Sequence, residues 1–291
     1  MSKLALGTAQ FGLDYGINNE RGKVPDREVT AILDFAAASG ITTLDTAAAY
    51  GDSEERLGRY LAGGGRRFQL ISKLQKNAAD PARALAASLA RLQAGALYGF
   101  LLHDFKTYEN DPSVWEKLQA LRTEGKVGKI GFSLYYPAEL EKLLTAGLRI
   151  DLVQLPYNLF DRRFARYFDR LKKAGVEVHV RSLFLQGLFF RPVAALSAHF
   201  NGVKGKLTAL RDLAARHKLS LLELALGFAL ANGAVDKAVV GVDSLANLQE
   251  IVAAERTASK AGKLPELADL QEDDEAIILP FNWTKEKSDA R

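Results

Sequence analysis

Short apolar segments alternate with helical segments eight times along the chain, which leaves few folds open to it. Alternating strands and helices favour βαβ units and a parallel sheet, and eight such units close a barrel. The strands are expected at residues 4–9, 42–45, 68–73, 97–103, 127–133, 152–156, 176–182 and 238–241. The sequence therefore predicts an α/β fold, a (β/α)8 TIM barrel that forms a single domain over residues 1–291.

Helices are expected between these strands, and longer loops at a few points. One helix starts at Ser53, and the others are expected at residues 25–39, 81–92, 112–124, 137–145, 163–174, 206–217, 220–231 and 244–254. A C-terminal tail from about residue 263 to 291 is expected to pack over the barrel mouth through the apolar run near Trp283 before fraying. Because long loops at a barrel's top face often carry function, the substrate should be determined by this tail and by residues 10–24, 104–111 and 183–205, the last being a long loop after strand seven.

Composition excludes several classes of function. The net charge of +4 comes from Lys and Arg scattered among Asp and Glu, without the basic stripe of a nucleic-acid-binding protein. There is no cysteine, and His179, His199 and His217 lack metal-ligand spacing. The chain starts without the apolar region of a signal peptide, and its most apolar long segment, residues 219–235, is short for a membrane span. We expect a cytoplasmic enzyme with no metal, nucleic-acid or membrane partner.

Ionisable residues stand at or just past the ends of three consecutive expected strands. Asp45 ends the second strand and Tyr50 follows it in a loop of small residues. Lys73 ends the third strand and His103 the fourth. Because the carboxyl ends of barrel strands point into one shared mouth, these four side chains should converge.

Together these four residues suit the reduction of a carbonyl group. Tyr is a poor acid, with a reference pKa of about 10, and we expect the ammonium of Lys73 to lower the pKa of Tyr50. Asp45 would pair with Lys73 and offset the cost of burying its charge, while His103 would hydrogen-bond a substrate oxygen. Taken singly, the residues are equally consistent with a structural ion pair, a rim aromatic and a core histidine. Their occurrence together favours protonation of a carbonyl oxygen as hydride reaches the carbon.

A segment from Asp45 to Gly58, D-T-A-A-A-Y-G-D-S-E-E-R-L-G, resembles the signature D-T-A-x-x-Y-G-x-S-E-x-x-L-G of the aldo-keto reductases. Lys73 and His103 stand in segments similar to that family's I-x-S/T-K and L-x-H segments. The resemblance continues in order through residues 131–133, 153–158, 185–188 and 241–250 and covers most of the chain. It implies a nicotinamide cofactor across the barrel mouth, Tyr50 as general acid tuned by Lys73 and Asp45, and His103 as the residue that orients the carbonyl.

The resemblance also implies cofactor contacts. Ser133 and Gln154 match positions that hold the nicotinamide carboxamide, and Leu134 replaces the Asn that usually follows this Ser. Where many members have an aromatic residue stacked on the nicotinamide, this chain has Arg181, whose flat guanidinium suits stacking, and Phe184 is the competing candidate. The cofactor-binding residues implied in this way are Gly7, Thr8, Asp45, Ser133, Gln154, Arg181, Ser182, Phe184, Gly187, Gly241, Asp243 and Asn247.

The adenosine end of the cofactor is expected at residues 240–250, after the eighth strand. NADP-selective members place Lys and Arg there, whereas Gly241 and Asn247 stand at those positions here, and Asp243 adds a negative charge nearby. The helix start at Ser244 still favours an anion, and Arg191 or Lys204 from the loop after strand seven could fold over it. NADPH is therefore the expected cofactor. Its preference over NADH should be weak, and NADH is the alternative cofactor.

These features predict an oxidoreductase that reduces an aldehyde or ketone, which could be sugar-derived, to an alcohol with NADPH or NADH. One alternative is the physiological oxidation of an aldose or alcohol with NAD(P)+. Another is a cofactor-sensing regulatory subunit, since some barrels of the family serve as partners of other proteins. Retention of all four chemical residues argues against pure sensing. A small carbonyl compound is the expected partner, and nothing in the sequence indicates a protein partner.

Overall fold

The computed structural model describes residues 2–76, 78, 80–258 and 270–283 of the chain. Eight parallel strands close into a barrel in the order of the sequence. They are β1 (Leu4–Gly7), β2 (Thr43–Asp45), β3 (Gln69–Leu74), β4 (Leu97–Leu102), β5 (Val127–Ser133), β6 (Leu152–Pro156), β7 (Glu177–Arg181) and β8 (Lys237–Gly241). The predicted (β/α)8 barrel is confirmed.

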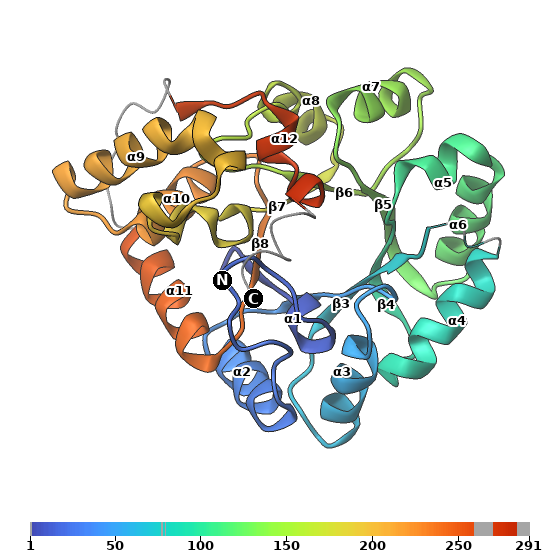
Figure 1. Cartoon of the computed structure of the whole chain (residues 1–291). Helices are drawn as coiled ribbons and strands as arrows, with labels where there is room; N and C mark the ends of the chain where they lie inside the picture. Colours follow the sequence, from blue (N-terminus) through green and yellow to red (C-terminus); the bar gives the residue numbers. More distant parts are fainter. Residues whose placement is uncertain (1, 77, 79, 259–269, 284–291) are drawn as a thin grey trace.

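Helices surround the barrel as an outer ring (Figure 1). They are α2 (Asp26–Ala38), α3 (Ser53–Ala62), α4 (Pro81–Leu92), α6 (Ser113–Thr123), α7 (Pro137–Thr145), α8 (Phe168–Lys173), α9 (Lys204–Arg216), α10 (Leu221–Leu230) and α11 (Leu245–Ala258). Several start at local capping signals, such as the capping box of Ser220 and Glu223 before α10. None of the helices in the described residues is both long and apolar enough to cross a membrane.

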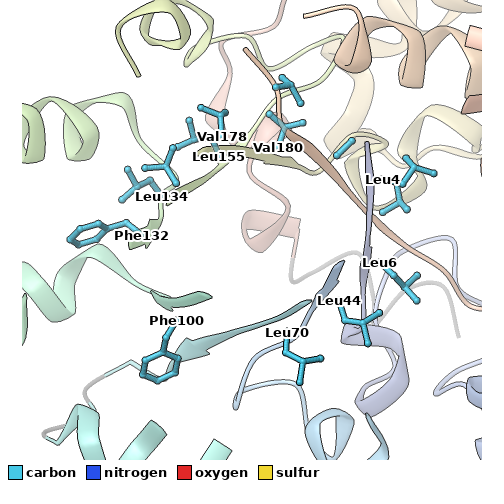
Figure 2. Close-up of a cluster of buried hydrophobic side chains, with 14 of the residues drawn as sticks. Leu4, Leu6, Leu44, Leu70, Phe100, Phe132, Leu134, Leu155, Val178 and Val180 are labelled. Atoms are coloured by element: carbon cyan, nitrogen blue, oxygen red, sulfur yellow. The ribbon is translucent and has the colours of Figure 1, made fainter. Parts of the chain in front are cut away.

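Alternate residues of each strand face opposite sides of the barrel wall. One set is buried and points outward to the helices (Figure 2): Leu4, Leu6, Leu44, Leu70, Phe100, Phe132, Leu134, Leu155, Val178 and Val180. The other set faces the barrel axis and includes a separate apolar cluster of Ile71, Leu101 and Leu152. Two positions further along the same strands stand Lys73, His103 and Gln154. A polar layer therefore follows an apolar one inside the barrel, toward its carboxyl end.

The sheet register places the polar residues at one level. Gly7 of β1 pairs with Asp45 of β2 and with Gly241 of β8. Ser133 of β5 pairs with Gln154 of β6. Since all strands are parallel, these positions share the carboxyl-end rim of the barrel.

Two expected loops and one expected helix differ from the prediction. Residues 10–24 and 104–111 contain short helices, α1 (Ala9–Gly12) and α5 (Phe105–Asn110). The helix expected from residue 163 instead begins with a 3₁₀ turn, η1 (Ala165–Tyr167), that leads into α8. Arg163 donates hydrogen bonds to the carboxylate of Asp161 and to the carbonyl of Tyr135. These bonds hold residues 161–163 as a turn, and hydrophobic periodicity gives no sign of them.

The long loop after β7 packs against the described part of the C-terminal tail. The loop contains the 3₁₀ segments η2 (Leu185–Phe190), η3 (Val193–Ala195) and η4 (Ala198–Val203), and the tail contains α12 (Glu275–Ile278) and η6 (Pro280–Trp283). Their apolar side chains form a second core cluster, in which Trp283 is 2% exposed. Residues 280, 281 and 283 also line a small cavity together with Arg181 at the end of β7, so this part of the tail reaches the barrel mouth. The remaining tail, residues 263–269 and 284–291, lies outside the described residues.

Candidate active site

Lys73 is fully buried near the end of β3 and joins the other polar residues of the barrel mouth. Its ammonium donates to Oδ1 of Asp45 at 2.6 Å, to the carbonyl oxygen of Thr46 at 2.9 Å and to the hydroxyl of Tyr50 at 3.4 Å. An ammonium has three N–H donors, so each of them has a partner. Complete pairing of this kind offsets the large cost of burying a charge.

Asp45 is held from the opposite side of the barrel as well. Its second carboxylate oxygen, Oδ2, accepts a hydrogen bond from Nε2 of Gln154 at 2.8 Å. Asp45 and Gln154 are both almost completely buried. The amide nitrogen of Gln154 is thus engaged by Asp45, and residues of β2 and β6 together position the partner of Lys73.

Tyr50 is positioned by a tight backbone contact between the segments that follow β1 and β2. A Cβ atom at Gly12 would lie 1.8 Å from the carbonyl oxygen of Tyr50. Gly51 has a φ of +54°, and a Cβ there would lie 2.4 Å from the carbonyl oxygen of Gly12. Both positions therefore require glycine. On the side chain, the ring of His103 packs edge-on against the Tyr50 ring, with centroids 5.7 Å apart.

Burial raises the pKa of Tyr50 above its ordinary value, and the carboxylate of Asp45 raises it further. The predicted net lowering of this pKa is wrong. Desolvation of the phenol is the largest influence and Asp45 adds to it, so the pKa rises although the ammonium of Lys73 lies 3.4 Å from the phenol oxygen. Tyr50 consequently keeps its proton across the physiological pH range, as a general acid must before it reacts.

The imidazole of His103 is neutral near physiological pH. Burial, reinforced by the positive charges of Lys73 and Arg181, lowers the pKa of His103 to about 3. A neutral imidazole has one N–H donor and one acceptor nitrogen. His103 can therefore donate a hydrogen bond to a substrate oxygen, but it does not carry the extra proton of an imidazolium and so does not act as the general acid.

A cavity of about 930 Å³ opens at the carboxyl ends of the strands. Tyr50 and His103 line it, while Lys73 is fully buried behind its wall. All residues expected to bind the cofactor also line this cavity: Gly7, Thr8, Asp45, Ser133, Gln154, Arg181, Ser182, Phe184, Gly187, Gly241, Asp243 and Asn247. The volume is typical of a cofactor or small-molecule site.

The cavity wall after β7 has a strained backbone. Ser182, Leu185 and Gln186 have left-handed φ angles of 59°, 44° and 51°, a conformation that costs roughly 1–3 kcal/mol for each non-glycine residue. Gly187 follows with a φ of 95°, and a Cβ there would lie 2.5 Å from Cβ of Asn18. Such strain tends to cluster at ligand sites, where the surrounding fold holds it in place.

Arg181, one of the two residues expected to stack on the nicotinamide, already stacks on a protein ring. Its Cζ lies 4.0 Å from the centroid of Tyr135. The guanidinium donates to the carbonyl of Leu134 at 2.9 Å and to the hydroxyl of Ser182 at 3.3 Å. The side chain of Leu134, where the family usually has Asn, points away into the core (Figure 2), so only its carbonyl serves this region. Phe184, the competing candidate, also lines the cavity, and its ring lies beside that of Phe190, with centroids 5.5 Å apart.

The far end of the cavity, beside β8 and α11, is acidic. Asp243 and Glu250 line it with Glu223 of α10. Among the described residues, the cavity has no basic side chain at this end, and neither Arg191 nor Lys204 lines it. Sequence reasoning named Asp243 but missed the other two carboxylates.

The helix start that was expected to attract an anion is already occupied. The backbone N–H of Leu245, at the start of α11, donates to the carboxylate of Glu28 at 3.1 Å. The hydroxyl of Ser244 accepts a hydrogen bond from the N–H of Asn247 at 3.2 Å. A phosphate would have to compete with these contacts.

Several other residues that line the larger cavity lie in loops and belong to no sequence motif. Tyr15, Asn18 and Asn19 come from the loop at residues 10–24, and Phe190 from the loop after β7, as expected for those two loops. Residues 104–111 do not line the cavity, because they fold as α5 on the outside of the mouth. Tyr135 follows β5 closely, and no pattern in the sequence singles it out.

Two buried oxygens of the cavity wall, Oε1 of Gln10 and Oε1 of Gln186, have no hydrogen-bond partner within the described structure. A buried acceptor without a donor is costly. A nicotinamide dinucleotide carries amide, amino and hydroxyl donors, so these residues fit such a cofactor.

Two histidines outside the site form hydrogen bonds with nearby residues. His179 is buried inside the barrel and bonds to the carboxylate of Glu177 at 2.6 Å, and His199 bonds to the carbonyl of Ala276 at 2.9 Å. Within the described ranges, no group of three or more His, Cys, Asp or Glu side chains could hold a metal ion.

Comparison with known proteins gives matches over most of the chain. A family model described as the aldo/keto reductase family matches residues 3–270. The uncharacterized oxidoreductase YrpG of Bacillus subtilis (strain 168) is 26% identical over 305 residues, which cover 87% of each chain. The apo form of an aldo-keto reductase from Bacillus halodurans is 26% identical, with a TM-score of 0.71 over 86% of this chain and 88% of that one. A glycerol dehydrogenase from Gluconobacter oxydans, at 23% identity, shares the fold, with a TM-score of 0.70 over 96% of this chain and 93% of its own.

Proposed function

The chain belongs to the aldo/keto reductase family, an NAD(P)H-dependent oxidoreductase family, and we propose that it reduces an aldehyde or ketone to an alcohol with Tyr50 as proton donor. One observation carries this proposal. The hydroxyl of Tyr50 lies at the wall of a large cavity with a buried ammonium, that of Lys73, 3.4 Å behind it and His103 beside it.

The reaction adds a hydride to the carbonyl carbon and a proton to the carbonyl oxygen. The reduced nicotinamide, when bound, supplies the hydride. Tyr50 donates its phenolic proton as negative charge develops on the oxygen, and the neutral His103 orients that oxygen with a hydrogen bond. The resulting phenolate of Tyr50 is stabilised by Lys73 and later regains a proton from solvent.

The raised pKa of Tyr50 makes Lys73 important during the transfer itself. A phenol that holds its proton firmly is a weak acid, so stabilisation of the phenolate has to be greatest in the transition state. The bond from Lys73 to Tyr50 is the longest of the three that this ammonium makes. It can shorten as charge develops on the phenol oxygen, which gives the differential stabilisation that catalysis requires.

The cofactor would be held by buried polar groups of the same cavity. We propose that Ser133 and the amide oxygen of Gln154 bind the nicotinamide carboxamide, because both side chains are buried at the cavity wall. The unpaired oxygens of Gln10 and Gln186 would accept hydrogen bonds from other donors of the dinucleotide.

We further infer that NADH binds better than NADPH, contrary to the expectation from sequence. A 2′-phosphate at the far end of the cavity would meet Asp243, Glu250 and Glu223, with no described basic side chain there to pair with it. Carboxylates suit a ribose instead, because they accept hydrogen bonds from its hydroxyl groups, as an acidic residue does in the NAD sites of Rossmann folds. The start of α11 already binds the carboxylate of Glu28.

Titrations of the protein with NADH and NADPH, followed by cofactor fluorescence, test this preference. The Kd for NADH should be lower by about tenfold or more, a difference of about 1.4 kcal/mol. The gap should narrow at high salt and in Asp243→Asn, which removes a charge at nearly constant size. Asp169→Asn, on the exposed side of α8, is the matched control and should leave the gap unchanged. Tighter binding of NADPH would contradict the inference.

A cofactor-depletion screen against aldehydes, ketoses and aldoses tests the reaction. Turnover should appear with at least one carbonyl compound and should fall by about 10²-fold or more in Tyr50→Phe, with little change in cofactor affinity. A variant with near-normal kcat would exclude Tyr50 as the proton donor. Cofactor binding without any turnover would favour a regulatory subunit, and faster oxidation of alcohols or aldoses would favour the reverse direction.

A further inference from the structure

Arg181 lies where two cavities of the barrel mouth meet. The smaller cavity, of about 290 Å³, extends toward the C-terminal tail and has an apolar wall that includes Ile17, Phe281 and Trp283. Five residues line both this cavity and the larger one: Tyr15, Tyr135, Arg181, Ser182 and Gln186. These five residues therefore form the boundary between the two cavities.

Arg181 is a half-buried cation whose polar partners in the described structure are all neutral. Its guanidinium donates to a carbonyl, that of Leu134, and to a hydroxyl, that of Ser182, and one of its faces covers the ring of Tyr135. Two of its five N–H donors are used in this way. Lys73 and Arg163, by contrast, have carboxylate partners in Asp45 and Asp161.

The charge of Arg181 reaches the reacting groups. It helps to lower the pKa of His103, and it opposes the rise in the pKa of Tyr50. Since Lys73 and Asp45 neutralise each other and both His103 and Tyr50 are uncharged, Arg181 leaves this end of the cavity with a net positive charge.

Among the described residues that line either cavity, no carboxylate at this end neutralises that charge, because Asp45 is paired with Lys73. The charge of Arg181 also acts on Glu139, but this carboxylate accepts the backbone N–H groups of Tyr135 and Tyr136 before α7 and lines neither cavity. The acidic residues of the larger cavity, apart from Asp45, lie at its opposite end beside β8, α10 and α11.

We propose that Arg181 binds an anionic group of the substrate, so that the preferred substrate is an aldehyde or ketone that carries a carboxylate or a phosphate. The inference rests on the proposed carbonyl reduction and names the substrate class of the same site. The carbonyl oxygen lies at Tyr50 and His103, the anionic group at Arg181, and any further part of the molecule in the smaller cavity. A guanidinium is well suited to this role because its planar donors match carboxylate and phosphate oxygens.

Matched pairs of carbonyl substrates test the proposal. Succinic semialdehyde is compared with butanal, 4-carboxybenzaldehyde with 4-methylbenzaldehyde, and glyceraldehyde 3-phosphate with glyceraldehyde. For the wild type, kcat/KM should be higher for at least one anionic member by about 10- to 100-fold, as charge-assisted hydrogen bonds allow. The first two pairs report on a carboxylate and the third on a phosphate. Equal rates within all three pairs would overturn the proposal.

Variants of Arg181 separate substrate binding from cofactor binding. Arg181→Gln should remove the preference for the anionic members, mainly through KM, so that kcat/KM falls by about 10- to 100-fold more for the anionic member of a pair than for its neutral partner. Arg181→Lys should retain part of the preference, because it keeps the charge but not the planar donors. Arg170→Gln, which removes an exposed positive charge from α8, is the control and should keep the full preference. A weaker Kd for NADH with an unchanged preference would assign Arg181 to the cofactor and overturn the proposal.

A binding measurement keeps this inference distinguishable from the proposed reaction. Succinate and inorganic phosphate are titrated calorimetrically into the NADH complex of Tyr50→Phe, and the same is done with Arg181 also changed to Gln. Saturable binding of either anion that weakens by about tenfold or more without Arg181 supports the anion site, even if no carbonyl compound is turned over. Binding of neither anion, or binding that is indifferent to Arg181, would overturn it.

Discussion

Replacing Lys73 by Met tests how the buried charges of the site depend on one another. The change removes the ammonium at roughly constant length and leaves Asp45 with one described hydrogen bond, from Gln154. Asp45 would then be a buried carboxylate without a counter-ion. Breaking a buried ion pair from one side costs about 3–5 kcal/mol, which is a large share of the roughly 5–15 kcal/mol that stabilises a domain.

The complementary variants turn this loss into a double-mutant cycle. Asp45→Asn strands the ammonium and should cost a similar amount, whereas the double variant leaves neither charge and should regain most of the lost stability. Urea unfolding at pH 7, followed by the fluorescence of the buried Trp115 and Trp283, gives the free energies. We expect a coupling energy of about 2 kcal/mol or more between the two positions.

Activity should behave differently from stability in the same cycle. The double variant should stay about 10²-fold or more below wild type in turnover, because the phenolate of Tyr50 lacks its stabilising ammonium. If each single change costs less than about 1 kcal/mol, Lys73 and Asp45 do not act as a buried pair. A double variant that recovers stability and turnover together would refute a role for Lys73 in proton transfer.

Three further results are expected. Gly12→Ala should shift the Tyr50 backbone and lower kcat by about 10²-fold in steady-state assays, while Gly95→Ala, where a Cβ meets nothing within 4 Å, should leave kcat unchanged. The folded-state pKa of His103, about 3, lies below its unfolded value of about 6.5, so unfolding takes up a proton and the free energy of unfolding falls as pH drops from about 6.5 toward 3. In urea melts between pH 6.5 and 4.5, His103→Gln should flatten this decline. An unchanged slope would mean that the fold does not hold His103 neutral. Asp243→Arg should raise NADPH affinity relative to NADH by about tenfold or more, and unchanged relative Kd values would place the 2′ position elsewhere.

The fold could be predicted from the sequence because its signals are local and repeated. The bounds of β5, β6, α4 and α7 match the expected ranges, since each element is marked by its own period and by flanking Gly, Pro or Asp residues. The first turn of the helix expected from residue 163 was lost to the bonds that Arg163 makes with Asp161 and Tyr135. Such contacts depend on tertiary structure, and hydrophobic periodicity does not report them.

The meeting of Asp45, Tyr50, Lys73 and His103 could also be predicted, because strand ends of a parallel barrel share one mouth whatever the loops do. The tight contact of Gly12 with Tyr50 could not, since it joins two segments that share no period or motif. The sequence thus identifies which residues meet, while the positions of their backbones depend on packing between loops.

The pKa shift of Tyr50 and the charge at the adenosine end could not be predicted from the sequence, for a related physical reason. The sequence-based prediction considered only the pair of Lys73 and Tyr50. A pKa reflects burial and every nearby charge, and here desolvation together with Asp45 outweighs the ammonium. The same holds at the adenosine end, where the residues near β8 suggested a weak phosphate site. Glu223 from α10 and Glu28 from α2 reach that end from distant parts of the chain. The local charge therefore depends partly on residues that lie far from β8 in the sequence.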